Sequence, residues 1–261
     1  MFPTTSDILP EWYPQYLKRI KSILNDGHSL VLVSKPHFDV WGKLAEELLD
    51  YKERIIIRFT ISSQNNELLK LMEPGAPFFE ERFGCLKLMH SKKYATSISM
   101  EPAIDLLKTP DLIKKLLPYC TVDLWVGTLN HIKKLRILNQ NKPEVLKAFD
   151  IIEANQQHNS NTVAILCEIK NISNKIVFKA GDKYRPDFRS MLGLSPSPFG
   201  VAEWGDNRKK NINYNLLKGC THDCVYCYAK QDQIQKGVST GESWKTPILK
   251  RSQPSCFRQE L

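Results

Sequence analysis

The sequence predicts an α/β fold built around a parallel sheet, either open or closed into a barrel. Short runs of β-branched and aliphatic residues alternate with longer segments of helical periodicity. Such alternation requires crossover connections, and these join parallel strands. Polar residues also gather directly after several of the runs, at the carboxyl ends of the predicted strands, where parallel sheets bind their ligands.

The predicted elements follow one another closely along the chain. Strands are predicted at residues 30–33, 55–61, 96–100, 122–127, 163–169 and 176–178. Helices are predicted at residues 11–25, 40–51, 79–91, 111–117 and 143–158. The turn-rich segment 193–200 then marks a break between residues 1–194 and residues 195–261, and the tail at 246–261 contains little periodicity. We expect these two parts to form a single domain.

The composition favours a globular protein over a disordered one. Of the 261 residues, 42% are hydrophobic and 25% are charged, which is ordinary for a globular protein. A chain of this length can bury a sizeable core. We find no apolar run of membrane-spanning length, and the segment after Met1 lacks the features of a signal peptide. Seven cysteines without a secretion signal indicate reduced thiols, so we expect a cytoplasmic protein that does not contact a membrane. Cys167, in an apolar run, is predicted to be a small core residue.

The net charge of +9 permits binding to nucleic acid or to another polyanion. Arg208, Lys209 and Lys210 form the tight basic cluster nearest to the cysteine-rich segment. The alternative is that the excess charge is simply a solvated basic face.

Polar side chains end or follow five of the apolar runs. They occupy residues 4–7, 34–37, 60–63, 99–102 and 127–130. Because the carboxyl ends of parallel strands lie at one edge of the sheet, this recurrence predicts a polar pocket there.

Three cysteines, Cys220, Cys224 and Cys227, lie within eight residues with the spacing Cys-x₃-Cys-x₂-Cys. Three thiolates on one short loop can hold three irons of a cubane cluster and leave the fourth iron open for chemistry. The alternative is a zinc site completed by His222, but four ligands within eight residues would be cramped and no second ligand pair is evident. We therefore expect His222 to be a loop residue rather than a ligand.

This loop, with Tyr226 before its last cysteine, resembles the signature of the radical S-adenosylmethionine (SAM) superfamily. Further segments are similar to its barrel strands, above all in the spore photoproduct lyase-like branch and related bacterial and phage proteins. These segments are residues 216–219, 1–8, 33–37, 58–62, 73–82 and 97–102. The resemblance implies a partial (β/α)6-type barrel that binds a [4Fe–4S] cluster and SAM. It also implies an electron donor such as flavodoxin or ferredoxin, and reductive cleavage of SAM to a 5′-deoxyadenosyl radical that abstracts hydrogen from a substrate.

The order of the motifs departs from the family, in which the cysteine loop comes first. Here residues 1–194 resemble the later part of the barrel, and residues from about 199 resemble its beginning. Joining Leu261 to Met1 would restore the family order. We interpret this as a circular permutation, which a barrel tolerates when all its elements remain; a gene-model or contig-joining artefact is the alternative.

The resemblance also assigns roles to individual residues. Cys220, Cys224 and Cys227 would ligate the cluster, and Tyr226 would pack near the SAM adenine. Polar residues at strand ends would contact the rest of SAM. Ser6 and Asp7 would bind its amino group, and Lys35 would face its carboxylate. Its remaining polar groups would be bound by Thr60, Ser62, Ser99 and Glu101. Several of these residues have a simpler explanation: Ser6 and Asp7 would cap the following helix, Lys35 would lie at the surface, Tyr226 would be a core aromatic that closes the loop, and Glu101 would form a turn with the next residue, Pro102.

For the other charged and titratable residues, the sequence does not favour a functional role over a structural one. Arg58 and Arg82 fit scaffold ion pairs as well as a site. His37, His90, His131 and His158 show no paired spacing and are expected to be structural.

One departure limits what the resemblance implies about the reaction. Spore photoproduct lyases carry a hydrogen-donating cysteine just ahead of the Ser-Asp pair, where this chain has Thr4 and Thr5. A hydroxyl hydrogen is bonded too strongly for that role, so the substrate is left open, with nucleic acid favoured by the basic charge. The rival from another class is a zinc-stabilised, basic nucleic-acid-binding protein without catalysis. A third possibility is an inactive relic that keeps the barrel but cannot assemble a cluster.

Overall fold

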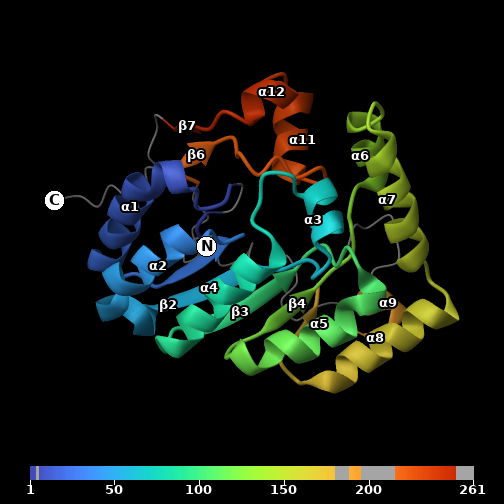
Figure 1. The fold of residues 1–261 in the computed structure, drawn as a ribbon, viewed down its shortest axis with the longest axis horizontal. Coiled ribbons are helices and arrows are strands. Elements are labelled where there is room, and N and C mark those ends of the chain that lie inside the picture. The colour runs from blue at the N-terminus through green and yellow to red at the C-terminus, as the bar shows by residue number, and fades with distance from the viewer. Residues whose placement is uncertain (4–5, 180–187, 195–214, 251–261) are drawn as a thin grey trace.

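A computed structural model describes residues 1–3, 6–179, 188–194 and 215–250 of the chain (Figure 1). Five parallel strands form one sheet in the order in which they occur in the sequence. They are β1 (Leu30–Ser34), β2 (Ile55–Thr60), β3 (Ala95–Met100), β4 (Leu124–Val126) and β5 (Ile176–Phe178). The prediction of an α/β fold with a parallel sheet is therefore confirmed, and the described strands form no closed barrel.

Phe2 extends this sheet beyond β1. It forms a parallel bridge with Leu32, in which its backbone N–H donates to Val31 (2.9 Å) and its carbonyl accepts from Val33 (3.0 Å). Phe2, which lies shortly before Ser6 and Asp7 in the sequence, therefore runs beside β1 in the same direction.

Helices connect the strands and cover the sheet. They are α1 (Tyr13–Asn25), α2 (Phe38–Glu47), α3 (Asn66–Met72), α4 (Phe79–Ser91), α5 (Thr109–Leu116), α6 (Ile132–Leu138), α7 (Pro143–Asn155), α8 (Ser160–Ile172) and α9 (Phe188–Met191). Short 3₁₀ turns lie at Pro10–Trp12, Leu49–Arg54, Leu106–Lys108 and Leu117–Tyr119. Helix α2 packs against α4 and α5 against α8, and Trp41 of α2 meets Phe59 of β2 edge to face. No helix of the described residues is long and apolar enough to cross a lipid bilayer.

The predicted strand at residues 163–169 is wrong, because these residues lie within helix α8. Asn159 caps the helix by accepting a hydrogen bond from the backbone N–H of Thr162 (2.9 Å). Leu166 and Ile169 are buried on its inner face, whereas Cys167 is exposed on the other side. Cys167 is consequently not the core residue that its apolar neighbours suggested.

The cysteine loop belongs to a small unit at the carboxyl-terminal end of the described chain. Strand β6 (Leu217–Lys218) pairs antiparallel with β7 (Ile248–Leu249), and α11 (Tyr228–Gln235) and α12 (Gly241–Trp244) lie between them in the sequence. Figure 1 shows this unit at the top, across the molecule from α5 and α8. The segment expected to supply the first barrel strand therefore does not join the parallel sheet in the described chain.

Some predictions fall outside the described residues. They concern Thr4, Thr5, the basic cluster Arg208–Lys210, most of the break at 193–200, and Leu261.

Candidate functional site

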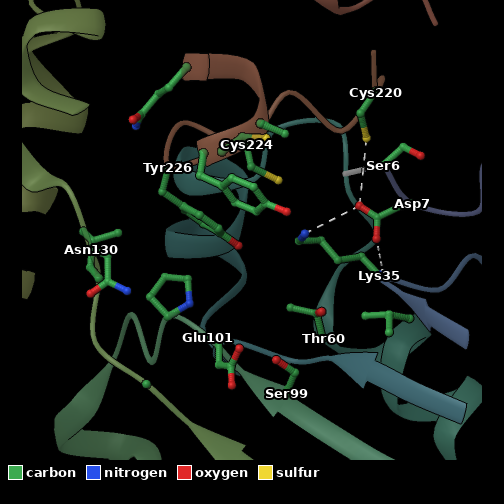
Figure 2. Close-up of a pocket in the computed structure, with 18 of the residues that line it drawn as sticks. Ser6, Asp7, Lys35, Thr60, Ser99, Glu101, Asn130, Cys220, Cys224 and Tyr226 are labelled. Atoms are coloured by element: carbon green, nitrogen blue, oxygen red, sulfur yellow. Dashed lines mark hydrogen bonds and ion pairs between the residues drawn. The ribbon is translucent and has the colours of Figure 1, made fainter. Parts of the chain in front are cut away.

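The carboxyl ends of the parallel strands and the cysteine loop line one cavity of about 560 Å³. Most of the predicted site residues meet there, although they come from distant parts of the chain (Figure 2). They are Ser6, Asp7, Lys35, Thr60, Ser99, Glu101, Cys220, Cys224, Tyr226 and Cys227. A cavity of this size is typical of a small-molecule or cofactor site.

Ser62 is the exception among the predicted residues. Its side chain is buried and donates a hydrogen bond to Glu73 Oε1 (3.0 Å), and it does not line the cavity. Ser62 follows β2 by two residues, whereas Thr60 at the strand end does reach the cavity.

The cysteine loop is held against the rest of the protein by backbone hydrogen bonds. Gly75 N–H donates to His222 O (3.0 Å), Val225 N–H to Met72 O (2.9 Å), and Cys220 N–H to Trp244 O (2.9 Å). A Cβ on Gly75 would lie 2.2 Å from the carbonyl oxygen of Thr221, so this close approach requires glycine. The loop is therefore fixed over the strand ends through the turn after α3.

All three loop cysteines are largely shielded from solvent. Cys220 and Cys224 are buried, Cys227 is half-buried, and Cys227 caps α11 by accepting a weak hydrogen bond from Lys230 N–H. Burial raises the pKa of each thiol, to about 12 for Cys220. Ligation would have to displace these protons, since only the thiolate binds metal.

Asp7 and Lys35 form a buried ion pair between the strands and the loop. Lys35 Nζ lies 3.5 Å from Asp7 Oδ2, and the backbone N–H of Lys35 donates to Asp7 Oδ1 (2.6 Å). Burial alone would raise the pKa of Asp7, but the charge of Lys35 and the interaction with His222 hold it well below its usual range. Burial likewise disfavours charged Lys35, yet Asp7 and other nearby acidic groups raise its pKa. Lys35 is thus a buried, paired cation rather than a surface lysine, and Asp7 does not cap a helix.

A chain of imidazoles leads from Asp7 towards the surface. His222 is fully buried, with Nδ1 2.7 Å from Asp7 Oδ2 and Nε2 2.8 Å from His37 Nε2. His37 is half-buried, and its Nδ1 faces Glu81 at 3.9 Å. The sequence predicts a structural role for His37 and a loop position for His222. Asp7 and His222 are separated by 215 positions, so no local spacing could reveal their contact.

A second buried network ties Tyr226 to the scaffold. Glu73 accepts hydrogen bonds from Tyr226 Oη and from Ser62, and it forms an ion pair with Arg82, whose side chain is fully buried. Burial alone would raise the pKa of Glu73, but Arg82 and Lys35 outweigh it and lower the pKa. Arg82 is therefore a scaffold ion-pair residue, while the ring of Tyr226 lines the cavity with Lys35 Nζ 6.0 Å from its centroid.

The far side of the cavity carries a separate set of polar groups. Glu101 accepts from Lys179 (2.6 Å), and Arg58 forms an ion pair with Asp123 (3.0 Å) while stacking 5.0 Å from the Trp125 ring. Ser99 also lines this side, below the loop in Figure 2. The cavity therefore has polar walls on both sides and sulfur donors along one.

Two sets of donor atoms in the described chain could hold a metal. The first is the three cysteines, which can each bind a different iron of one cluster and need not converge on a single point. The second is Asp7, Cys220 and His222, whose ligand atoms all lie within 4.8 Å of one another. The two sets share Cys220.

The chain was compared with protein-family models, with curated proteins and with solved structures. None of the three comparisons found a match. Its function therefore has to be inferred from the site itself.

Proposed function

We propose that this protein is a radical SAM enzyme, with a [4Fe–4S] cluster on Cys220, Cys224 and Cys227. One observation carries the proposal: the three cysteines and the polar ends of four parallel strands line the same cavity. An isolated structural metal site would not require a cavity of about 560 Å³ beside it.

The donor set fits such a cluster. Three thiols come from one loop. Burial raises the pKa of each, and the charge of Lys35 partly opposes that rise, so Lys35 would offset part of the negative charge of the thiolates. Within the described residues no fourth cysteine lines the cavity, so three-thiolate ligation would leave one iron open to a small molecule. When bound, the cluster would supply the electron that cleaves SAM to the hydrogen-abstracting 5′-deoxyadenosyl radical.

The chain's own residues would bind and orient SAM. Lys35 offers a cation to the SAM carboxylate, and Asp7 with Ser6 offers oxygen acceptors to its amino group. Tyr226, fixed by Glu73, presents its ring to the cavity as a surface for the adenine. Thr60, Ser99 and Glu101 remain for the ribose or the substrate, whereas Ser62 is engaged with Glu73 and would act only through it.

The fold proposal that accompanies this function is a circularly permuted partial (β/α)6-type barrel. The parallel extension of the sheet by Phe2 beside β1 supports it, as does the contact of Asp7, five residues further on, with Cys220 of the loop. The chemistry further implies an electron donor such as flavodoxin or ferredoxin and a reducing compartment such as the cytoplasm. Among substrate classes, nucleic acid suits the net charge of +9.

Anaerobic reconstitution with iron and sulfide tests the proposal. We expect a brown protein with about four irons per chain that forms 5′-deoxyadenosine from SAM and dithionite. Cys224→Ala should lose both properties, and Cys167→Ala, which removes an exposed cysteine away from the site, should keep both. A wild-type protein without bound iron and sulfide, or a Cys224→Ala variant that still cleaves SAM, would show the proposal to be wrong.

A further inference from the structure

Asp7, Cys220 and His222 bring three different metal-binding atoms to one point. His222 Nδ1 lies 2.7 Å and Cys220 Sγ 3.9 Å from the same oxygen, Asp7 Oδ2. In the described ranges of the chain, this is the only group of three histidine, cysteine, aspartate or glutamate ligand atoms within 4.8 Å of one another. All three residues are buried, so this group of side chains is not a chance gathering of surface acids.

We propose that Asp7, Cys220 and His222 form a binding site for a single zinc-like divalent cation, an alternative to the three-cysteine set with which it shares Cys220. Thiolate, imidazole and carboxylate together are ligands that suit Zn²⁺, which accepts sulfur, nitrogen and oxygen in tetrahedral geometry. Three protein ligands leave a fourth position, and this position would face the cavity that Asp7 and Cys220 line. The inference goes beyond the proposed function and does not depend on it.

The groups around the triad would orient its ligands. The second ring nitrogen of His222 lies 2.8 Å from His37 Nε2, which can take its N–H bond when Nδ1 turns to a metal. Asp7 Oδ1 is held by the backbone N–H of Lys35, leaving Oδ2 for the ion. Metal-binding histidines and carboxylates are usually fixed by such outer hydrogen bonds.

The charge balance sets a condition on binding. Lys35 Nζ lies 3.5 Å from Asp7 Oδ2 and opposes a second cation there. Loss of the Cys220 proton on binding supplies one compensating negative charge, so one proton should be released from that thiol per ion bound. Replacing Lys35 with Met should therefore tighten binding.

Cys220 cannot serve this site and a cluster at once. A bound divalent ion would therefore block cluster assembly on the loop, and a bound cluster would exclude the ion. This set of ligands also differs from a Cys₃His site, because Cys224 and Cys227 take no part.

Anaerobic titration of the metal-free protein with Co²⁺ tests the proposal, because cobalt replaces zinc and its absorption reports thiolate ligation. We expect one equivalent to bind with a single-thiolate charge-transfer band. Cys220→Ser, His222→Gln and Asp7→Asn should each weaken binding at least about 100-fold, and His37→Ala about 10- to 100-fold, as outer partners do. Cys224→Ser and Cys227→Ser should bind cobalt as the wild type does.

The cysteine variants separate the two proposals. A band that survives in Cys224→Ser and disappears in Cys220→Ser supports the triad even if no iron–sulfur cluster can be assembled on the wild type. A band lost equally in all three cysteine variants, a spectrum of three thiolates, or no cobalt binding overturns the triad, whether or not the cluster forms. In addition, one equivalent of Zn²⁺ added first should block reconstitution of the iron–sulfur cluster on the wild type but not on His222→Gln. If zinc leaves cluster reconstitution unchanged in both proteins, the bound ion and the cluster do not exclude each other.

Discussion

Replacing Arg82 with Met should destabilise the protein strongly, because Arg82 is a fully buried cation with several partners. Its guanidinium forms an ion pair with Glu73 and donates to the carbonyls of Pro77 (2.7 Å) and Thr60 (3.3 Å). Removing one partner of a buried ion pair costs about 3–5 kcal/mol of unfolding free energy. The two orphaned carbonyls place the expected loss in the upper half of that range, since each unpaired buried group costs about 1–3 kcal/mol.

Urea denaturation followed by circular dichroism would measure the loss as a lower midpoint at an unchanged slope. Adding Glu73→Gln should recover part of it, because Gln removes the uncompensated charge but still accepts hydrogen bonds from Ser62 and Tyr226. Arg136→Met is the matched control: Arg136 pairs with Asp150 and Glu153 near the surface, and its loss should cost at most about 1 kcal/mol. Arg82→Met and Arg136→Met with equal midpoints, or a double variant no more stable than Arg82→Met, would refute the reasoning.

Three further outcomes are expected. The pKa of Glu73 is lowered from 4.5 in the folded state, so its contribution to stability should be complete above pH 4.5 and be lost as the pH falls through the lowered value. The urea midpoint of Glu73→Gln should therefore depend less on pH in the acid range than that of the wild type. Parallel curves of midpoint against pH would contradict this. Gly75→Ala should displace the cysteine loop, since its Cβ would meet Thr221 O at 2.2 Å, and so reduce iron and cobalt binding, whereas Gly42→Ala, with open space around it, should not; equal metal binding by the two would rule out this role for Gly75. Asn159→Ala should cost about 1 kcal/mol through loss of the α8 cap, and an unchanged urea midpoint would show the cap to be dispensable.

Local patterns in the sequence predict most of the sheet, because strand alternation and helix periodicity are short-range properties. The predicted helix at residues 79–91 coincides with α4, and the strand at 55–61 is one residue longer than β2. The wrong prediction of a strand at residues 163–169 has a physical reason, because a short apolar run is compatible with both a buried strand and a buried helix segment. The signal that could have decided it is Asn159, three residues before Thr162, where a helix cap belongs.

The candidate site is predictable only in part, because its residues meet through the fold. The rule that ligands bind at the carboxyl ends of parallel strands is sufficient to gather Lys35, Thr60 and Ser99 in one place. The contacts between His222 and Asp7 and between Tyr226 and Glu73 span 215 and 153 positions, and nothing local encodes them. The sequence predicts that Ser62 lines the site because it follows a strand end, but its side chain turns inward and completes a buried hydrogen-bond network with Glu73.

The late position of the cysteine loop in the chain does not weaken its fit to the strand ends. The loop and the preceding chain supply complementary halves of the same buried networks: Asp7 meets His222, Glu73 meets Tyr226, and the side-chain amide of Asn139 donates to Val225 O (3.1 Å). Without the loop, two carboxylates would each lose a buried partner, at a cost of about 1–3 kcal/mol for each unpaired group. These contacts therefore join the loop to the strand ends, whichever order of segments encodes the fold.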